Sequence, residues 1–419
     1  MRVSVIVVAL LLTLGPLFAA PGSAEARDKD EKHQEEILVK FKEGVSEAVE
    51  QDVHKTKGGE VKKEKEIKGL GVEVVKVGKG KAEAKIQEYL QDPNVDYAEA
   101  LGIGYVDWAP GDAMYAQQWS LNNTGQNGGK ADADIDGPRA WDVTRGASNS
   151  RSAIAILDTG INEAHPDLAG KVVDRANWTF APTLNDVYGH GTHVSGIAAA
   201  STTAGGGSGI AGVCPDCTLL NVKVCDDSGA CNYDYMANGV LWAVGCEWRD
   251  GAGNCLSPVR SRSINLSITG TFNSITLRDA INKAWSRGAV VSCAAGNEGS
   301  TTQVYPAGYA NCIAVAATTS ADARASFSNY GSGWVDVAAP GEGILSTVKS
   351  GGYESWNGTS MATPHVAATA GLLWSTKLCS NASCVRNRIE SQADRIAGTG
   401  SQWSKGRLNA CRAVGGTQC

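Results

Sequence analysis

Short apolar segments that alternate with helical stretches constrain the fold of this chain most. Five such segments are Ala153–Leu157, Leu219–Val224, Ser263–Ile268, Ala289–Ser292 and Ile313–Ala317. Helices are predicted over His193–Ala200, Tyr235–Trp248, Leu277–Arg287 and Ser360–Lys377. Strands that are apolar along their whole length and are linked by helices are typical of a parallel sheet with both faces buried. The sequence therefore predicts an α/β fold with a parallel sheet.

The chain divides by composition into two blocks. Residues 27–105 are rich in both acidic and basic residues and contain no Cys or Trp, whereas every Cys and Trp lies from residue 106 onward. In the first block, strands are predicted over Ile37–Phe41 and around Val72–Val77, and a helix over Ala82–Leu90, which indicates a small α+β unit. The formal charge of the whole chain is −6, which gives no electrostatic reason to expect nucleic acid as a partner.

The first residues are typical of an export signal. Met1 and Arg2 precede the apolar run Val3–Ala20, and small residues up to Ala26 offer a cleavage site. A retained membrane anchor is the alternative, but the run is short and no stop-transfer cluster follows it. We therefore expect residues 1–26 to be a signal peptide and the protein to be secreted and extracellular.

All 12 cysteines lie between Cys214 and Cys419. An even number in an exported chain favours disulfides over reduced thiols. The sequence alone does not fix the connectivity, but close spacing makes five couples plausible: Cys225/Cys231, Cys246/Cys255, Cys293/Cys312, Cys379/Cys384 and Cys411/Cys419. Cys214 and Cys217 are left over, and this pair could also be half of a zinc site or a redox pair, although no second such pair or nearby His supports that.

Asp158 ends the apolar segment Ala153–Leu157. In a parallel sheet, reactive groups gather at the carboxyl ends of strands, and a carboxylate that emerges from apolar residues needs a partner to offset its lost hydration. Taken alone, an Asp at such a place is more often the cap of a turn. Asp158 is therefore a candidate catalytic residue only in combination with others.

A base that titrates near neutrality is most often a histidine. The second block contains four of them: His165, His190, His193 and His365. His190 lies between two glycines that leave its ring accessible, which favours it as the base, whereas His193 faces the helix and is expected to be a packed or hydrogen-bonded residue. A metal site formed by His190 and His193 is the alternative, but no third ligand is evident nearby.

Ser360 is the candidate nucleophile. It begins the apolar helix predicted over Ser360–Lys377 and is surrounded by small residues that keep its hydroxyl approachable. A simple N-cap would explain the serine but not those neighbours. Asn297 follows another predicted strand and could donate its side-chain amide to an oxyanion together with the Ser360 backbone N–H, although Asn-Glu-Gly alone would indicate a turn. His365 is expected to lie in the core.

These residues occur in the order Asp158, His190, Asn297 and Ser360, and the sequence around them resembles the subtilisin-like serine proteases, the subtilases. The matching stretches span about Asp112 to Val414 and are Asp158-Thr159-Gly160, His190-Gly191-Thr192-His193, Asn265-Leu266-Ser267, Ala295-Gly296-Asn297-Glu298-Gly299 and Gly358-Thr359-Ser360-Met361-Ala362-Thr363-Pro364-His365. The resemblance implies a three-layer catalytic domain with a parallel sheet over residues 106–419.

The resemblance also assigns roles to these residues. Ser360 would attack the scissile carbonyl, His190 would take and return the proton, Asp158 would orient His190, and Asn297 would stabilise the oxyanion on the way to an acyl-enzyme. The walls of the substrate site would be Ser267, Ile268, Thr269, Ala294, Ala295 and Gly296, with Val304 near the base of the principal pocket. These walls carry no obvious buried carboxylate, so we expect broad cleavage after apolar or medium-sized residues, although Thr269 replaces a glycine common among relatives.

The first block resembles the subtilase propeptide, which assists folding, inhibits the enzyme and is removed by the enzyme itself. Residues 27–105 would form it, Asp92–Glu99 would be its final segment, and the cut would fall between Gly102 and Asp112. The expected partners are protein and peptide substrates and the chain's own propeptide. We expect no nucleic acid, no membrane, no organic cofactor and a monomeric protein.

Calcium is the one cofactor that the resemblance implies. Asp112 and Asp167 match Ca²⁺ ligands of many relatives. In the loop Gly205–Ile210, however, glycine replaces the expected Asn, which removes one ligand from a site that needs six or more oxygens. A calcium site at Asp112 and Asp167 is therefore predicted with an incomplete set of ligands.

Three rival functions differ from a broad protease. A serine esterase of the α/β-hydrolase type needs Gly-x-Ser-x-Gly and the order Ser, Asp, His, which this chain lacks. A catalytically silent binding protein with the same fold is disfavoured because all four chemical residues are present. A processing protease with narrow specificity stays open.

Overall fold

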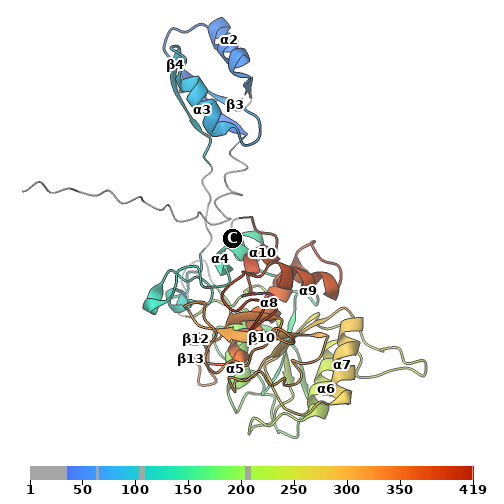
Figure 1. Ribbon diagram of the computed structural model, residues 1–419. Helices are drawn as coiled ribbons and strands as arrows, with labels where there is room; N and C mark the ends of the chain where they lie inside the picture. The colour runs from blue at the N-terminus through green and yellow to red at the C-terminus, as the bar shows by residue number, and fades with distance from the viewer. Residues whose placement is uncertain (1–34, 63–65, 103–108, 203–208, 418) are drawn as a thin grey trace, which may run out of the picture. The chain divides into compact units, whose positions relative to one another are not determined.

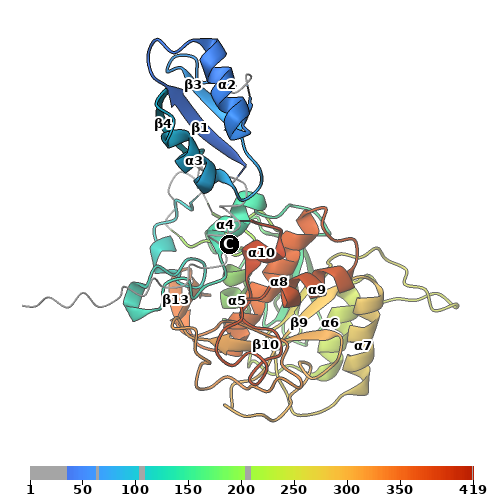
Figure 2. The same cartoon turned by 45° about the horizontal axis from the view of Figure 1, so that its top comes forward.

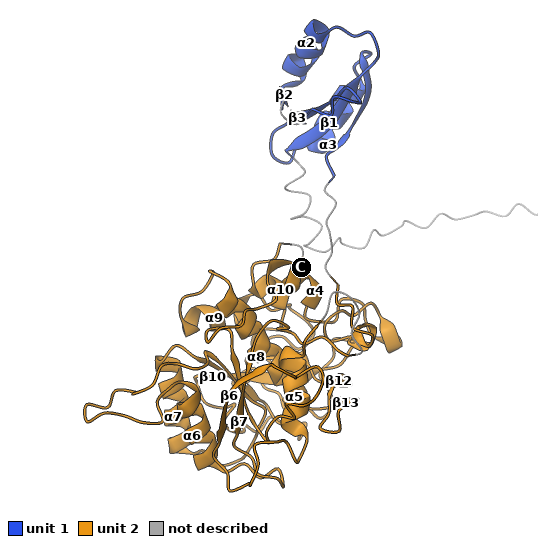
Figure 3. Ribbon diagram, turned by 180° about the vertical axis from the view of Figure 1, so that it is seen from behind, with its two compact units in different colours: residues 1–105, 418 blue, residues 106–417, 419 orange. Residues whose placement is uncertain are grey.

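The computed structural model describes residues 35–62, 66–102, 109–202, 209–417 and 419. The chain forms two compact units, residues 1–105 with 418 and residues 106–417 with 419, which Figure 3 shows in different colours. The predicted signal segment lies outside the described residues, as does most of the predicted cleavage region between Gly102 and Asp112. Each unit has a hydrophobic core of its own.

The first unit is an antiparallel sheet with two helices. Its elements are β1 (Glu36–Phe41), α2 (Glu47–Lys57), β2 (Glu60–Val61), β3 (Val72–Lys76), α3 (Ala82–Leu90) and β4 (Val95–Ala100). The strand order is β2-β3-β1-β4. Alternate residues of β1, from Ile37 to Phe41, are buried in a core to which both helices contribute, because successive side chains of a strand point to opposite faces. The predicted α+β unit is confirmed, with α2 and β4 as additional elements.

The second unit is built on a seven-stranded sheet whose neighbouring strands all run parallel. Its strands are β5 (Ile154–Asp158), β6 (Val172–Asn177), β7 (Leu219–Lys223), β8 (Ser263–Leu266), β9 (Val290–Ala294), β10 (Cys312–Thr318) and β11 (Val337–Pro340). The order is β11-β10-β9-β8-β5-β7-β6, so the chain runs from β5 to the edge at β6 and, after β7, crosses to β8 and continues to the other edge at β11. At such a switch point the loops diverge and leave a crevice at the carboxyl end of the strand. Asp158 is the last residue of β5 and borders that crevice.

Helices cover both faces of this sheet (Figure 1). Ile154 and Ile156 of β5 belong to the core that α5 (His190–Ala199) and α8 (Thr359–Ser375) cover. Ala155 and Leu157 belong to the opposite core, which α6 (Tyr233–Ala243) and α7 (Ile275–Ser286) cover. The turned view shows α6 and α7 side by side (Figure 2). The predicted three-layer α/β architecture is confirmed.

The predicted helices occur with shifted ends. The helix predicted over Tyr235–Trp248 begins at Tyr233, after Asn232, and already ends at Ala243. It ends early because Gly245 has a φ of +67°, and a Cβ there would lie 2.0 Å from the carbonyl oxygen of Pro258. The chain therefore leaves the helix at a close contact that only glycine permits.

Smaller elements complete the second unit. They are α4 (Gly137–Val143), the hairpin of β12 (Ile344–Thr347) and β13 (Tyr353–Trp356), α9 (Ala382–Ser391) and α10 (Ala410–Ala413). Strand β12 packs against α5, and α9 and α10 pack against α8. Both central helices are therefore held from the side away from the sheet. No helix among the described residues combines the length and the apolarity needed to cross a bilayer.

All twelve cysteines form disulfides, and the five couples that spacing favoured are confirmed. Cys214 and Cys217 form the sixth. The interpretation of this pair as half of a zinc site is therefore wrong, because a disulfide sulfur is not the thiolate that zinc needs.

Candidate active site

Asp158 and His190 come together at the carboxyl end of β5. Asp158 is 1% exposed, and His190 is the first residue of α5. The imidazole Nδ1 lies 2.8 Å from Asp158 Oδ1 and 3.0 Å from Oδ2. A Cβ at Gly191 would lie 2.2 Å from the carbonyl oxygen of Gly160, so glycine lets α5 begin directly against the end of β5. The predicted pairing of these two side chains is what the geometry shows.

The charge of Asp158 acts directly on the imidazole. Burial alone pushes the pKa of His190 down, since it disfavours the charged ring. The charge of Asp158, its hydrogen bond and the charge of Asp186 act in the opposite direction and outweigh burial, so the pKa of His190 is raised above its ordinary value. An imidazole held in this way can accept a proton at Nε2 and keep it while Asp158 offsets the charge.

Ser360 is the second residue of α8 and lies beside Ser267. Its hydroxyl donates to the carbonyl oxygen of Ser267 (3.1 Å), and the Ser267 hydroxyl donates to the carbonyl oxygen of Ser360 (2.8 Å). Among the hydrogen bonds of the described residues, none joins Ser360 Oγ to His190. Such bonds are often long in a free enzyme and shorten when substrate binds. The convergence of all three side chains therefore stays a prediction for the Ser360 contact.

The side chain of Asn297 is held in place by hydrogen bonds to its amide oxygen. Its Oδ1 accepts from the backbone N–H (2.9 Å) and the hydroxyl (3.0 Å) of Thr359, which leaves Nδ2 to donate elsewhere. A Cβ at Gly358 would lie 3.5 Å from Ser360 N and 3.7 Å from Asn297 Nδ2. The two donors therefore border one small space beside Gly358, which is the arrangement that an oxyanion needs.

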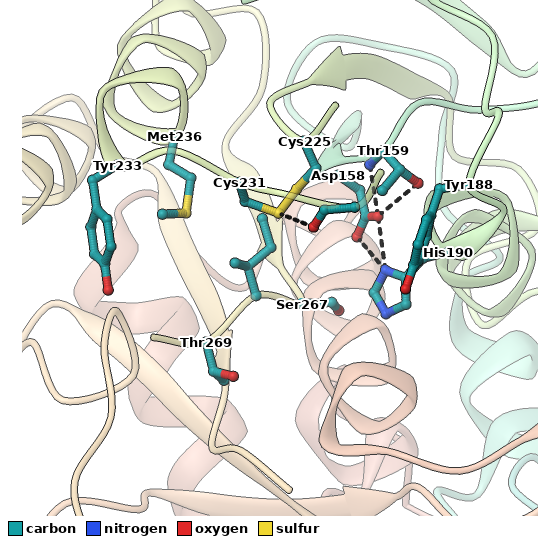
Figure 4. Close-up of a pocket in the computed structure, with 12 residues that line it drawn as sticks. Asp158, Thr159, Tyr188, His190, Cys225, Cys231, Tyr233, Met236, Ser267 and Thr269 are labelled. Carbon is teal, nitrogen blue, oxygen red and sulfur yellow. Dashed lines mark hydrogen bonds and ion pairs between the residues drawn. A yellow bond between two sulfur atoms is a disulfide. The ribbon is translucent and has the colours of Figure 1, made fainter. Parts of the chain in front are cut away.

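A hollow of about 280 Å³ lies beside Asp158 and His190 (Figure 4). Asp158, His190 and the predicted wall residues Ser267, Ile268 and Thr269 line it. Ala294, Ala295 and Gly296 are buried, Val304 is 6% exposed, and none of these four is among the described residues that line this hollow. The structure therefore places one of the two predicted walls beside Asp158 and His190 and not the other.

The opposite wall of the hollow was missed in the sequence. Tyr188, Tyr233, Met236 and the disulfide Cys225–Cys231 line it. In Figure 4 the disulfide lies between Met236 and Asp158. The cysteine spacing predicted the bond, but only the return of the chain from β7 to α6 places it at the site. Tyr233 was missed because the helix that it begins was predicted to begin two residues later.

His193 and His365 are packed in the interior of the second unit. His193 Nε2 lies 3.0 Å from the carbonyl oxygen of Glu354, and its ring stacks on Trp356 at 4.3 Å between centroids. Burial lowers the pKa of His193 to about 3, which keeps the ring neutral. His365 is buried and its Nδ1 lies 2.9 Å from the carbonyl oxygen of Met361. Both rings are packed, as predicted.

Asp112 and Asp167, the predicted calcium ligands, are both buried. Asp167 Oδ2 accepts from the Ile210 N–H (2.9 Å), and Asp112 accepts from the Thr202 hydroxyl. Burial and the charges of Asp167 and Asp112 raise the pKa of Tyr353, so the charges of both carboxylates act on the same tyrosine hydroxyl. Two gathered carboxylates fit a hard cation. In the described part of the chain, no three acidic, His or Cys side chains meet as a metal site, and residues 203–208 of the predicted loop lie outside it.

Two family models match the two units of the chain. The model described as "Subtilase family" matches residues 149–407, which include Asp158, His190, Asn297 and Ser360. The model described as "Fervidolysin N-terminal prodomain" matches residues 19–100. The second match supports a prodomain in the first block.

Several known proteases are similar along most of their length. The chain is 48% identical over 283 residues to thermitase of Thermoactinomyces vulgaris, which covers 67% of this chain and 93% of thermitase. It is 38% identical over 385 residues to the thermophilic serine proteinase of Bacillus sp. strain AK1, which covers 91% of this chain and 87% of the relative. A solved protease structure from Pseudoalteromonas arctica PAMC 21717 superposes with a TM-score of 0.63 at 29% identity and covers 74% of this chain and 99% of that one.

The fold, the pairing of Asp158 with His190 and these similarities all indicate the same protein family. A parallel sheet with its switch point at β5 carries the carboxylate, and the family match extends over the whole sheet. The identity to thermitase alone is high enough over most of its length to decide the family. The chain belongs to the subtilases and is a serine protease with an N-terminal prodomain.

Proposed function

We propose that this protein is a secreted endopeptidase in which Asp158, His190 and Ser360 form the catalytic triad. The observation that carries the proposal is the 2.8 Å contact between His190 Nδ1 and Asp158 Oδ1. It holds the ring with Nε2 turned away from Asp158, as Figure 4 shows, and so leaves Nε2 to act as the base.

The chemistry follows from these positions. Ser360 Oγ attacks the carbonyl carbon of the scissile bond while His190 Nε2 takes the hydroxyl proton, and the electron pair of the C=O bond moves onto oxygen. The resulting oxyanion accepts from Ser360 N–H and Asn297 Nδ2. The C–N bond then breaks, and the imidazolium gives its proton to the leaving amine, which leaves an ester on Ser360. Water repeats the attack with the same base and releases the acid.

The hydroxyl of Ser360 has to turn before it can react. In the free protein it donates to the Ser267 carbonyl oxygen, at the wall of the hollow that lies beside His190. A substrate chain that lies along this wall competes for that carbonyl oxygen, since the carbonyl is the acceptor that a peptide N–H needs. Binding of substrate would thereby release the hydroxyl for His190.

The protein is made as a zymogen in this proposal. Residues 1–26 are the signal peptide, residues 27–105 are an inhibitory propeptide and residues 106–419 are the peptidase domain. The match to a prodomain family over residues 19–100 supports this division, as does the boundary between the two compact units after Tyr105. The cut between Gly102 and Asp112 would then be made by the enzyme itself. The mature protein acts outside the cell as a monomer.

The substrate site favours apolar or medium-sized residues. Ile268, Tyr233 and Met236 contribute apolar surface to the hollow, and the one carboxylate among the described residues that line it, Asp158, is bonded to His190. A protease that demands Arg or Lys needs a buried carboxylate free for that side chain. Broad cleavage of proteins and peptides follows, whereas a processing protease would cleave one motif in a peptide library.

A serine-directed sulfonyl fluoride tests the reaction. The mature protein should hydrolyse casein, and the reagent should abolish hydrolysis with one adduct, found by mass spectrometry on the peptide that contains Ser360. Protein unfolded before treatment is the control and should stay unlabelled, because only the folded site activates the hydroxyl. Hydrolysis that survives complete labelling would contradict the mechanism. Untreated protein without any activity would indicate a silent binding protein instead.

Calcium is the proposed structural cofactor, held by Asp112 and Asp167. Removing it with a chelator should lower the melting temperature by about 5 °C, because a ligand that binds only the folded state stabilises that state. Added Ca²⁺ should restore the melting temperature, measured by circular dichroism. The variant Asp167→Asn should lose this response, and the control Asp174→Asn, at an exposed ion pair with Arg260, should keep it. A melting temperature that no chelator changes would contradict a calcium site.

A further inference from the structure

Asp186 is a second buried carboxylate at the active site, and the mechanism above gives it no role. It is 2% exposed in the loop between β6 and α5. Its Oδ1 accepts from the Thr159 hydroxyl (2.8 Å) and the Gly189 N–H (2.6 Å). Its Oδ2 accepts from the N–H (2.8 Å) and the hydroxyl (2.6 Å) of Thr192. Each oxygen of the Asp186 carboxylate therefore accepts two hydrogen bonds.

The partners of Asp186 flank the catalytic pair in the sequence. Thr159 follows Asp158 at the end of β5, and Gly189 directly precedes His190 at the start of α5. Asp186 thus connects the two segments whose side chains must bond. A shift of either segment would have to break bonds to a buried carboxylate, which is costly.

Asp186 also determines to which carboxylate the Thr159 hydroxyl donates its hydrogen bond. The Thr159 hydroxyl lies 2.8 Å from Asp186 Oδ1 and 3.3 Å from Asp158 Oδ1. It has one proton, so the shorter contact takes it. Asp158 Oδ1 is then left to the Thr159 N–H and the imidazole of His190.

The charge of Asp186 is not cancelled by a cation. All four of its donors are neutral, and no ion pair between described residues includes Asp186. The free N–H groups at the start of α5 stabilise the anion instead. A second full negative charge therefore lies near the imidazole beside that of Asp158.

We propose that Asp186 is the positioning residue of the catalytic pair: it holds the end of β5 against the start of α5 and adds a second negative charge that stabilises the imidazolium form of His190. This inference rests on the proposed triad and extends it. Asp186 does not touch the substrate, so it acts through Asp158 and His190 alone.

Besides Asp158 and Asp186, other charged or titratable groups lie on the segments around His190. They are Tyr188 on the loop before α5, His193 on α5, Lys223 at the end of β7 with its partner Asp227, and Lys349 on the loop after β12. His193 stays neutral above pH 4 because burial lowers its pKa to about 3, and Lys223 is paired with Asp227 at 2.9 Å. Asp158 and Asp186 are the groups that raise the pKa of His190.

The test is the pH dependence of kcat/KM for the mature enzyme on a short peptide anilide. The acidic limb reports the base of the free enzyme, which must be neutral to act. Asp186→Asn keeps the size of the side chain and removes its charge, so protonated His190 becomes less stable and the limb should move to lower pH by about 0.5 to 1 unit. In addition, kcat should fall by about ten- to a hundredfold, because the pair is less well positioned.

Two further variants separate charge from shape. Asp174→Asn is the matched control at an exposed site and should leave both the limb and kcat unchanged. Asp186→Glu keeps the charge, so its limb should stay at the wild-type pH even where kcat falls. If Asp186→Asn is not secreted as folded protein, Thr159→Val takes its place: it removes the connecting hydroxyl and should lower kcat.

The outcomes are distinct. A limb that stays in place in Asp186→Asn, or moves equally in Asp186→Glu, would overturn the role of the charge. An unchanged kcat in Thr159→Val would overturn the connection through the hydroxyl. Wild-type protein that hydrolyses nothing at any pH would instead refute the proposed function, and the variants would then say nothing against Asp186 in particular.

Discussion

Ser360→Ala is expected to lower kcat on casein or a peptide anilide by about a million-fold, the size of the effect known for subtilisin, a relative of this chain. The physical reason is that the variant has no oxygen to form the acyl-enzyme, while the donors beside Gly358 and the substrate walls are unchanged. The residual rate should therefore still exceed that of the uncatalysed reaction.

The same variant should also keep its propeptide. Intact mass and N-terminal sequencing of the secreted protein should show a cut wild type and an uncut variant, because the proposed cleavage uses the same hydroxyl. Ser286→Ala, at the exposed end of α7, is the control and should be cut and active. Wild-type activity in Ser360→Ala would refute the triad, and a cut Ser360→Ala chain would show that another protease removes the propeptide.

Asn297→Leu should lower kcat by about 100- to 1,000-fold with little change in KM. Leucine matches the amide in size but donates no hydrogen bond, so the oxyanion loses one of its two donors. The ground-state carbonyl depends less on that donor than the oxyanion does, and the loss therefore falls on kcat. This size of effect is again known from subtilisin.

Steady-state kinetics on a peptide anilide measure the change at Asn297. Asn282→Leu, an amide replaced on the exposed face of α7, is the matched control and should keep wild-type kinetics. A rise in KM with an unchanged kcat would mean that Asn297 binds substrate rather than the oxyanion. An equal loss of kcat in Asn282→Leu would mean that the change reflects impaired folding and not the loss of a donor to the oxyanion.

The central strands could be predicted because burial on both faces makes them apolar along their whole length. Strand β5 has no exposed residue, and its neighbours β7 and β8 are equally buried. Strand β6 lies at the edge of the sheet, where only its first residue is buried and partly buried residues such as Asp174 alternate with exposed ones such as Arg175, so it lacked that signal. Strand β11 was missed because two of its four residues are Ala and one is Pro, which are uncommon in strands.

The pairing of Asp158 with His190 could be predicted because both residues lie at the ends of elements. Asp158 ends a buried strand and His190 begins a helix, and both positions are visible in the sequence. The wall formed by Tyr188, Met236 and the Cys225–Cys231 disulfide depends on which loops meet in space, and no local pattern carries that information. For the same reason the contacts between Asp186 and Thr159 could not be predicted, because the partners of a polar loop residue are determined only when the chain folds.

The six disulfides all join cysteines that are close along the chain, with separations from 3 to 19 residues. Each ring can close before the parallel sheet exists, whereas pairing of β5 with β8 must wait for residues far apart to meet. Formation of the disulfides and assembly of the parallel sheet can therefore occur as separate steps of folding. A newly made chain can acquire its correct bridges early, and mispaired sulfurs are disfavoured because the right partner of each cysteine is the nearest one along the chain.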